Sequence, residues 1–174
     1  SQTNTTPMKY KILTLLLLIS VISVAQQNLN LIPKPHSVKI KKGHFVLNKE
    51  TVIVADENSF EAKYLQNEIY NRTGLELKIS SKSRSKNSIQ FGVKIPDTTN
   101  FDREQYDIQV WKNKIHISAF SNKGVFYGIQ TLLQMIPYSK SGEIRLNEVS
   151  ISDQPKFQWR GMHLDVSRHF FPKN

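Results

Sequence analysis

The sequence predicts an α+β domain, in which two helices cover one face of a mostly antiparallel sheet. In two stretches, 59–73 and 123–135, apolar residues recur at spacings of three and four, which gives each stretch one apolar stripe. Shorter segments around them alternate apolar and polar residues with the period of two that is typical of strands. Because a helix with one stripe needs only one surface to bury it, we expect both helices on the same face of the sheet.

The N-terminal residues are typical of a secretory signal. Lys9 and Lys11 precede the apolar run 12–24, and small residues up to Ala25 end it. The run is shorter than the roughly 20 residues that span a bilayer comfortably. We therefore expect residues 1–25 to be upstream residues and a signal peptide, the protein to be exported to the periplasm or secreted, and no stable membrane span after cleavage. An uncleaved membrane anchor is the alternative.

The strands follow from alternation and β-branched content. Residues 37–40 and 44–47 alternate around Lys-Lys-Gly at 41–43, which predicts a β-hairpin with Gly43 in its turn. A second hairpin is expected across Lys-Asn-Lys at 112–114. The remaining strands are expected at 51–55, 75–79, 89–93, 106–111, 115–118 and 146–151.

The helices have recognisable ends. Asn58 with Glu61 three residues later predicts a capping box, and Gly74 stands where a left-handed C-terminal cap belongs. Pro137 ends the second helix, and Gly128 within it permits close approach to a neighbouring backbone. Gly124 and Gly128 lack the Lys-Ser or Lys-Thr of a phosphate-binding loop, so we expect no nucleotide cofactor.

Composition excludes several classes of function. The formal net charge is +10, with 24 Lys+Arg against 14 Asp+Glu, which would permit nucleic-acid binding. The lysines, however, flank the signal or sit at turns and form no basic stripe with interleaved aromatic residues, so we expect no nucleic-acid partner. The absence of cysteine excludes disulfides, thiolate metal sites and cysteine nucleophiles. His163 has no partner ligand at helix or strand spacing, and we expect no metal site.

The C-terminal stretch 157–171 reads Phe-Gln-Trp-Arg-Gly-Met-His-Leu-Asp-Val-Ser-Arg-His-Phe-Phe. Its front half alternates and carries Trp159, Leu164 and Val166, which predicts a buried strand. The guanidinium of Arg160 offers a rigid fork of donors that can hold two sugar oxygens. Judged from the residues alone, an ion pair between Arg160 and a core carboxylate such as Asp165 is the more economical interpretation.

Arg160-Gly161, followed by Leu-Asp-Val-Ser-Arg-His-Phe at 164–170, resembles the first barrel strand of glycoside hydrolase family 20, the β-N-acetylhexosaminidases. The stretch 123–134 and the proline pair Pro33 and Pro35 are similar to further parts of that family. The resemblance implies that Arg160 binds hydroxyls of a terminal N-acetylhexosamine on an oligosaccharide or glycoconjugate. Because Asp165 stands near the C-terminal end of that barrel strand, where a carboxylate often faces the active site, we expect it to hold Arg160, Arg168 or His169 in place. Direct contact of Asp165 with the sugar is the alternative.

A (β/α)8 barrel typically needs about 250 residues, so 174 residues are too few to contain one. We therefore expect an N-terminal fragment: upstream residues and signal at 1–25, an α+β domain at 26–152, and the start of a truncated TIM barrel at 153–174. The family resemblance implies a retaining mechanism in which the substrate's own acetamido oxygen is the nucleophile, one of the exceptions to two-carboxylate hydrolysis.

The family's adjacent Asp-Glu pair, which supplies the acid and its partner, comes from a later barrel strand. The only Asp-Glu in this chain is Asp56-Glu57, in the small domain, so no residue here is expected to be catalytic and the fragment alone is expected to be inactive. Two alternatives stay open: a non-catalytic carbohydrate-binding or interaction module, and another barrel glycosidase with a similar leading domain. The stretch from Arg160 to Phe171 disfavours the second.

Overall fold

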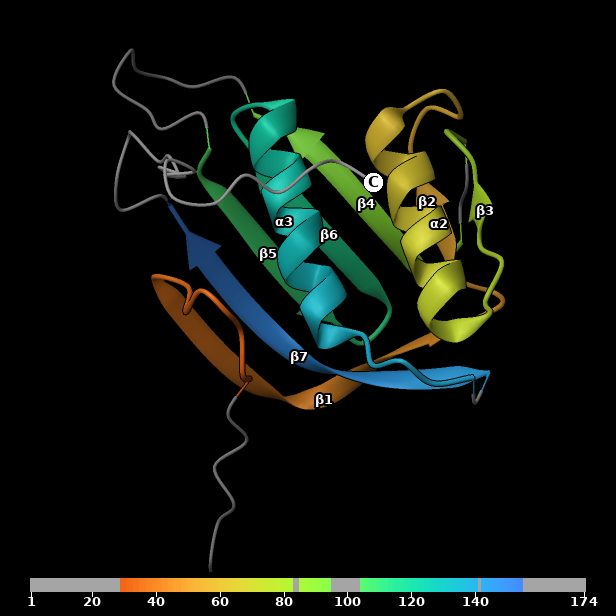
Figure 1. Ribbon diagram of the computed structural model, residues 1–174, viewed down its shortest axis with the longest axis horizontal. Coiled ribbons are helices and arrows are strands. Elements are labelled where there is room, and N and C mark those ends of the chain that lie inside the picture. Colours follow the sequence, from red (N-terminus) through yellow and green to blue (C-terminus); the bar gives the residue numbers. More distant parts are fainter. Residues whose placement is uncertain (1–28, 83–84, 95–103, 141, 155–174) are drawn as a thin grey trace, which may run out of the picture.

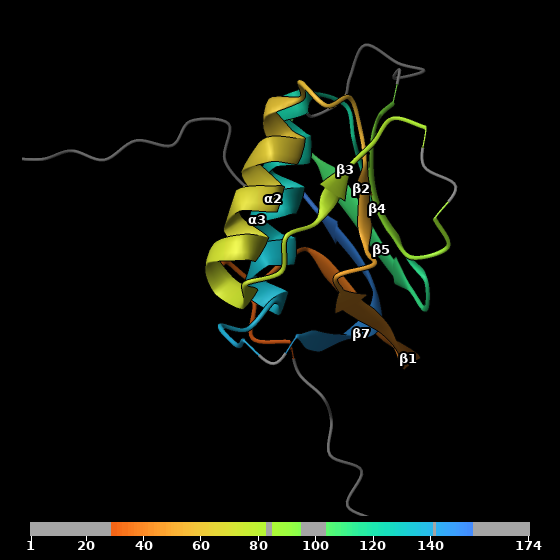
Figure 2. The same ribbon diagram turned by 90° about the vertical axis from the view of Figure 1, so that its right-hand side faces the viewer.

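A seven-stranded sheet and two helices on one of its faces form the domain (Figure 1). The computed structural model describes residues 29–82, 85–94, 104–140 and 142–154. Viewed from the side, α2 (Phe60–Thr73) and α3 (Asn122–Met135) form one layer and the sheet forms the other, so the expectation that both helices share a face is confirmed (Figure 2). Neither described helix is long and apolar enough to cross a membrane.

The strands lie in the order β1-β7-β5-β6-β4-β2-β3 across the sheet. The helices are α2 (Phe60–Thr73) and α3 (Asn122–Met135). The strands are β1 (Ser37–Asn48), β2 (Val52–Val54), β3 (Lys78–Ile79), β4 (Ser88–Val93), β5 (Tyr106–Trp111), β6 (Lys114–Ala119) and β7 (Glu143–Asp153).

The sheet is mixed, so the expectation of a mostly antiparallel sheet was wrong. The pairs β1–β7, β7–β5 and β5–β6 are antiparallel, whereas β6–β4, β4–β2 and β2–β3 are parallel. A helix between two strands serves as a crossover connection, and a crossover brings the second strand back in the direction of the first. The helix α2 connects β2 to its parallel neighbour β3 in this way, and the domain is α/β rather than segregated α+β.

The predicted first hairpin is also wrong, because its two halves belong to the single strand β1. Both halves pair with the long strand β7, and the register shifts between Ile40 and His44. These two residues are four positions apart on β1, whereas their partners Val149 and Asn147 are only two positions apart on β7. Gly43 adopts a φ of 124° at this irregularity. With an eleven-residue partner alongside, Lys-Lys-Gly forms a bulge instead of reversing the chain.

The helix ends follow ordinary capping chemistry. The N-cap of α2 is Ser59, one residue after the predicted Asn58. The Ser59 Oγ accepts a hydrogen bond from the backbone N–H of Ala62 and donates one to Glu61 Oε2 at 3.0 Å. Gly74 is left-handed with a φ of 74°, as predicted for the C-terminal cap. The last turn of α3 gives way to the extended Ile136, a conformation favoured by the proline that follows it.

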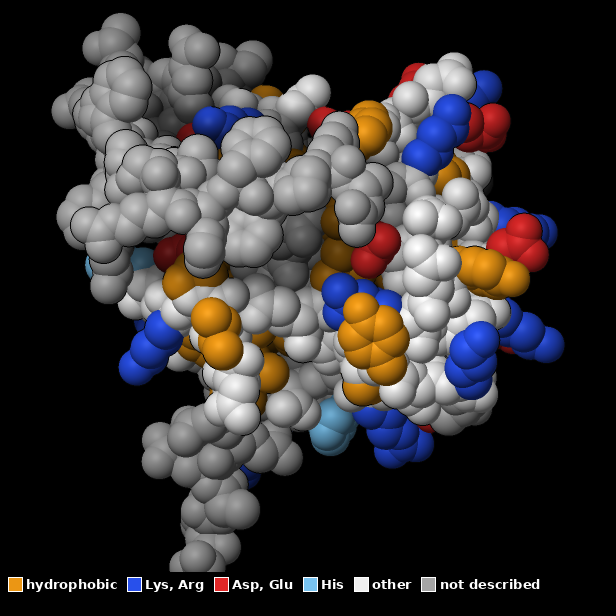
Figure 3. Space-filling model, viewed as in Figure 1, with side chains coloured by type: hydrophobic (Ala, Val, Ile, Leu, Met, Phe, Trp, Pro, Cys, Tyr) orange, Lys and Arg blue, Asp and Glu red, His pale blue; other side chains and the backbone are white. Residues whose placement is uncertain are grey.

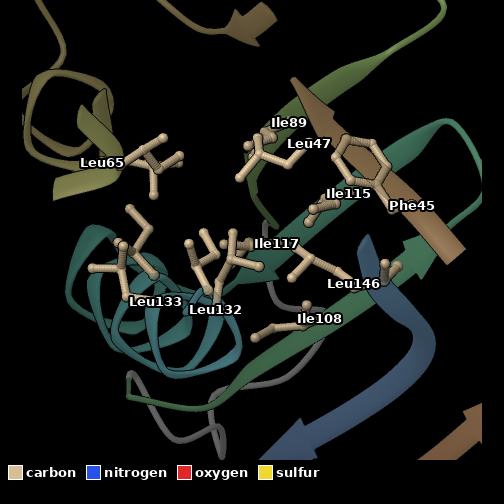
Figure 4. Packing of buried hydrophobic residues seen from close by; sticks show 14 of the residues in the cluster. Phe45, Leu47, Leu65, Ile89, Ile108, Ile115, Ile117, Leu132, Leu133 and Leu146 are labelled. Carbon is tan, nitrogen blue, oxygen red and sulfur yellow. The ribbon is translucent and has the colours of Figure 1, made fainter. Parts of the chain in front are cut away.

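The core lies between the two layers. Leu65 of α2 and Leu132 and Leu133 of α3 point toward the sheet, where isoleucine side chains meet them (Figure 4). These isoleucines come from the central strands and include Ile89, Ile108, Ile115 and Ile117, all fully buried. The apolar faces that the sequence predicted for the helices and for the strands thus pack against each other in a single core.

Candidate functional site

The predicted sugar-binding residue Arg160 and its expected support Asp165 lie outside the described residues, and so do Trp159, His163 and the predicted signal. The description ends at Gln154, one residue past the end of β7. What the structure does show is the part of the domain from which the chain continues toward Arg160.

A hydrogen-bonded network surrounds that point. Asp153, the last residue of β7, accepts a hydrogen bond through Oδ2 from the Tyr106 hydroxyl at 3.0 Å. The same hydroxyl lies 2.6 Å from Thr131 Oγ1 on α3. Because Tyr106 donates its single proton to the carboxylate, it accepts the proton of Thr131. The other carboxylate oxygen, Oδ1, accepts from the backbone N–H of His36 at 3.0 Å. One carboxylate therefore joins β7, β5, α3 and the segment before β1.

Tyr106 is held firmly in this network. Its side chain is only 5% exposed, and its ring lies beside Gly128 of α3. Burial raises the pKa of the Tyr106 hydroxyl well above its ordinary value, and the negative charge of Asp153 raises it further, while the hydrogen bond from Thr131 acts in the opposite direction. The hydroxyl is thus a neutral donor, as the pairing with a carboxylate requires.

The segment that leads into β1 is fastened to the same helix. The side chain of Gln134 on α3 accepts from the backbone N–H of Ile32 at 2.8 Å and donates to the carbonyl of Ile32 at 2.9 Å. Together with the bond between His36 and Asp153, this places the start of the domain and its end side by side, against α3.

An aromatic cluster lies on the outer side of the helix layer. It consists of Phe60 and Tyr64 of α2 and Phe126 of α3, with ring centroids 5.2 to 6.5 Å apart. The buried residues of α2, including Leu65, face the sheet, so Phe60 and Tyr64 lie on the opposite side of that helix. Phe60 is 67% exposed. A hydrogen bond of 3.0 Å from Gln130 to the Tyr64 hydroxyl links the two helices beneath it.

A cleft of about 540 Å³ opens where β2 and β4 end and both helices begin. Crevices at the carboxyl ends of parallel strands are where open α/β sheets bind ligands. Its lining mixes Phe60 and Phe91 with the polar side chains of Asp56, Glu61 and Asn122. Such a lining suits a neutral hydroxylated ligand better than an anion, because both ionisable groups named are acids.

Asp56 of the Asp-Glu pair has a structural task at this cleft. Its Oδ1 accepts a hydrogen bond from the backbone N–H of Asn58 at 2.7 Å, and its carbonyl accepts from Ser59 at 3.0 Å. This is the turn that starts α2.

The face of the sheet opposite the helices is polar. His116 on β6 stands in register with Gln109 on β5 and Gln90 on β4. Burial lowers the pKa of the His116 imidazole, and the positive charges of Lys114 and Lys94 lower it further. Within the described ranges, no three histidine or acidic side chains are grouped so that they could hold a metal ion.

Basic side chains are scattered over the visible part of one face of the molecule. On the helix side of the molecule, Lys and Arg appear along the rim and lower edge and form no single patch (Figure 3).

Sequence reasoning missed the Asp153 network. The sequence places Asp153 two residues past the last expected strand, Tyr106 in a strand and Thr131 in a helix. The partners of Asp153 lie 47 and 117 positions away along the chain. No local pattern carries such a pairing, so one sequence offers no signal from which to find it.

Comparisons with known proteins relate this domain to one family of glycosidases. Residues 28–154 match the family model described as glycosyl hydrolase family 20, domain 2. A β-hexosaminidase of Porphyromonas gingivalis is 34% identical over 154 residues, covering 83% of this chain and 19% of that protein. β-Hexosaminidase subunit A1 of Dictyostelium discoideum is 26% identical over 171 residues, covering 94% of this chain and 32% of that protein. The chain thus spans about a fifth to a third of the length of these relatives.

Solved structures give the same result. The family 20 β-N-acetylhexosaminidase of Streptomyces coelicolor superposes with a TM-score of 0.65 at 27% identity, over 83% of this chain and 30% of that one. The chitobiase of Flavobacterium johnsoniae gives 0.61 at 32% identity, over 83% and 23%. The exo-β-N-acetylglucosaminidase of Vibrio harveyi, solved in complex with N-acetylglucosamine, gives 0.63 at 26% identity, over 82% and 21%.

The resemblance seen in the sequence is therefore confirmed for the described domain, and the residues that the structure describes contain no barrel strand. With the family model matching most of its length, the chain belongs to glycoside hydrolase family 20, and its described domain is homologous to domain 2 of the family's β-hexosaminidases.

Proposed function

We propose that the chain is the N-terminal part of an exported β-N-acetylhexosaminidase, which removes terminal GlcNAc or GalNAc from glycans by a substrate-assisted retaining mechanism. The observation that carries this proposal is the match of residues 28–154 to domain 2 of a glycosidase family whose relatives are several times longer. The catalytic acid and its partner then come from residues beyond Asn174, and residues 153–174 begin the catalytic barrel.

The described domain has a supporting role in this proposal. Asp153 is tied to Thr131 through Tyr106, so the chain leaves the domain beside α3. A domain that starts there lies next to the helix layer, where Phe60 of the aromatic cluster is exposed and Tyr64 and Phe126 are partly buried. The cluster offers that domain an apolar surface, and large aromatic side chains contribute strongly to such contacts. We propose that the catalytic domain packs on the outer side of α2 and α3.

Arg160 supplies the sugar contact in the proposed enzyme. Its fork of donors suits two neighbouring hydroxyls of a terminal N-acetylhexosamine. Asp165, near the C-terminal end of the proposed barrel strand, holds Arg160 or a neighbouring cationic side chain in place, since functional residues of such barrels gather at that end. The V. harveyi relative is solved with N-acetylglucosamine bound, which supports this choice of substrate.

The decisive experiment compares the complete gene product with the 174-residue chain, using an aryl N-acetylglucosaminide and the matching aryl glucoside as control. We expect the complete enzyme to hydrolyse the first substrate only, and the short chain to hydrolyse neither. A complete gene product without this activity, combined with binding of chitooligosaccharides by the short chain, would instead support the non-catalytic carbohydrate-binding module.

Export is tested separately. N-terminal sequencing of the protein recovered from the periplasm or the medium should give a mature chain that starts near Gln26, as the signal pattern predicts. Recovery of exported material that still carries Met8 would contradict cleavage at this site.

A further inference from the structure

The strand β1 (Ser37–Asn48) forms one edge of the sheet. Its twelve residues pair with β7 on one side, and no described strand lies on its other side (Figure 1). A free edge carries backbone N–H and C=O groups that can pair with a strand of another molecule. The opposite edge of the sheet, β3, has only two residues and offers little to pair with. The long edge at β1 is therefore where a second copy of the chain could add its own strand.

The bulge interrupts this edge near its middle. Lys41, Lys42 and Gly43 stand opposite the single residue Glu148 of β7, so they break the regular ladder. Gly43 has a φ of 124°, and a Cβ atom at this position would come within 2.5 Å of Glu148 Oε1. The positive φ and the nearby carboxylate both favour glycine here. Because the strand is irregular at this point, its free side cannot form one continuous ladder with another strand.

Positive charge covers the same part of the edge. Lys39, Lys41 and Lys42 are exposed, and none of them forms an ion pair with another described residue. Antiparallel pairing of two copies centred on the bulge would place these lysines beside one another, and like charges on facing strands are destabilising. Ile40, which lies among them, is 36% exposed. An exposed apolar residue on a long edge would otherwise favour such pairing.

We propose that the bulge at 41–43, together with its lysines, keeps β1 from pairing edge to edge with a second copy of the chain. The bulge interrupts the ladder, and the lysines repel an approaching copy. Bulges and lysines are both means by which natural sheets protect their edges. The inference concerns self-association alone, and it holds whether or not the proposed function is correct.

The test uses the 174-residue chain and two variants. The deletion variant lacks Lys42 and Gly43, which leaves Lys41 alone opposite Glu148 and makes β1 a regular strand. The lysine variant combines Lys39→Thr, Lys41→Thr and Lys42→Thr, which keeps the length of β1 and removes its charge. Threonine is chosen because β-branched residues suit strands.

Each variant has a matched control at exposed positions outside β1. Deletion of Ser81 and Lys82, between β3 and β4, removes the same number of residues away from the edge. The combination of Lys82→Thr, Lys86→Thr and Lys112→Thr removes the same charge as the lysine variant. Urea unfolding shows whether each variant is folded before its association is measured.

We expect the deletion variant to self-associate at a concentration about tenfold or more below that of the wild type, as measured by sedimentation velocity, because several cross-strand pairs form between two regular edges. Amide hydrogen exchange at residues 37–48 should slow as this variant associates. The lysine variant should associate more than the wild type by a smaller factor, and about 0.5 M NaCl should reduce the difference between them by screening the lysines. Both controls should behave as the wild type does.

A folded deletion variant that associates no more than the wild type would overturn the inference. Association that leaves exchange at residues 37–48 unchanged would overturn it as well, because the contact would then lie elsewhere. Slower exchange of the same residues in concentrated wild type would show that β1 already pairs with a second copy, which also contradicts the inference. If the deletion variant does not fold, the lysine variant decides by the same two measurements, and an unchanged lysine variant then counts against the inference.

Discussion

Gly128 of α3 lies so close to Ile117 of β6 that a Cβ atom at position 128 would come within 2.5 Å of Ile117 Cγ2. The Tyr106 ring is the next neighbour, at 3.4 Å. The sequence predicted that Gly128 permits a close approach, but to a backbone; the structure shows that a core side chain takes the space. Ile117 is fully buried and β-branched, so it has little freedom to move aside.

Gly128→Ala should therefore destabilise the domain. Alanine gains up to about 1 kcal/mol of helix propensity over glycine, but overpacking of a filled core costs roughly 1–3 kcal/mol. We expect a net loss in the free energy of unfolding, measured by urea denaturation of the 174-residue chain. Asn67→Ala, at an exposed position of α2, is the control and should be neutral or slightly stabilising. An increase in stability for Gly128→Ala would contradict the tight packing.

The aromatic cluster should matter more in the complete enzyme than in the short chain. Replacing Phe60 and Phe126 together with serine removes their contacts with one another and with Tyr64 in both proteins, and it removes further apolar contacts only if another domain covers them. We expect the double variant to lower the melting temperature of the complete enzyme by several degrees, as a loss of roughly 1–2 kcal/mol would, and to leave the 174-residue chain much less affected.

The control for the aromatic cluster is Trp111→Ser at the end of β5, where the side chain is 38% exposed and points away from the helix layer. It should affect the complete enzyme and the short chain alike. Equal effects of the Phe60 and Phe126 replacements in both proteins would show that no domain packs on this side of the helices.

The stability of the domain should fall in mild acid in part through His116. Burial, Lys114 and Lys94 hold the pKa of His116 below its ordinary value, so the unfolded chain binds a proton that the folded chain does not. The free energy of unfolding should therefore decrease as the pH falls from about 7.5 to about 5.5, through the unfolded pKa of about 6.5. His116→Gln should show a smaller decrease over the same range in urea unfolding.

Salt distinguishes the causes of this pH dependence. About 0.5 M NaCl screens the two lysines but leaves the burial of His116 unchanged, so it should reduce the slope without abolishing it. A slope that is identical in the wild type and in His116→Gln would show that other groups are responsible.

Arg160→Ala should severely impair the complete enzyme. In the proposed enzyme, the loss of this two-pronged arginine would leave sugar hydroxyls poorly paired in a desolvated pocket, at a cost of about 2–4 kcal/mol. The corresponding loss of kcat/KM is roughly thirtyfold to nearly a thousandfold on an aryl N-acetylglucosaminide. Activity within about threefold of the wild type would remove Arg160 from the sugar site and leave the ion pair with a core carboxylate as its explanation.

Much of the local structure was predictable from the sequence. The apolar stripe at 59–73 and the glycine at 74 predicted α2 and its left-handed C-terminal cap. The alternation of apolar and polar residues predicted the antiparallel hairpin of β5 and β6 with nearly correct bounds. These features depend on residues within a few positions of one another, through side-chain periodicity and the φ preferences of glycine and proline. The sequence also indicated the family, which the match over residues 28–154 confirms, although the stretch 160–170 that carried most of the resemblance lies outside that match.

What the sequence by itself determined is therefore which segments become helices or strands and which face each one buries. Only the tertiary structure decided how they combine: that β2, β4 and β6 run parallel, that Lys-Lys-Gly at 41–43 is a bulge, and that Asp153 meets Tyr106 and His36. Each of these depends on partners far apart in the chain. Burial of an apolar face is non-directional, so a hydrophobic pattern shows that a strand needs neighbours without showing which strand they are or which way they run.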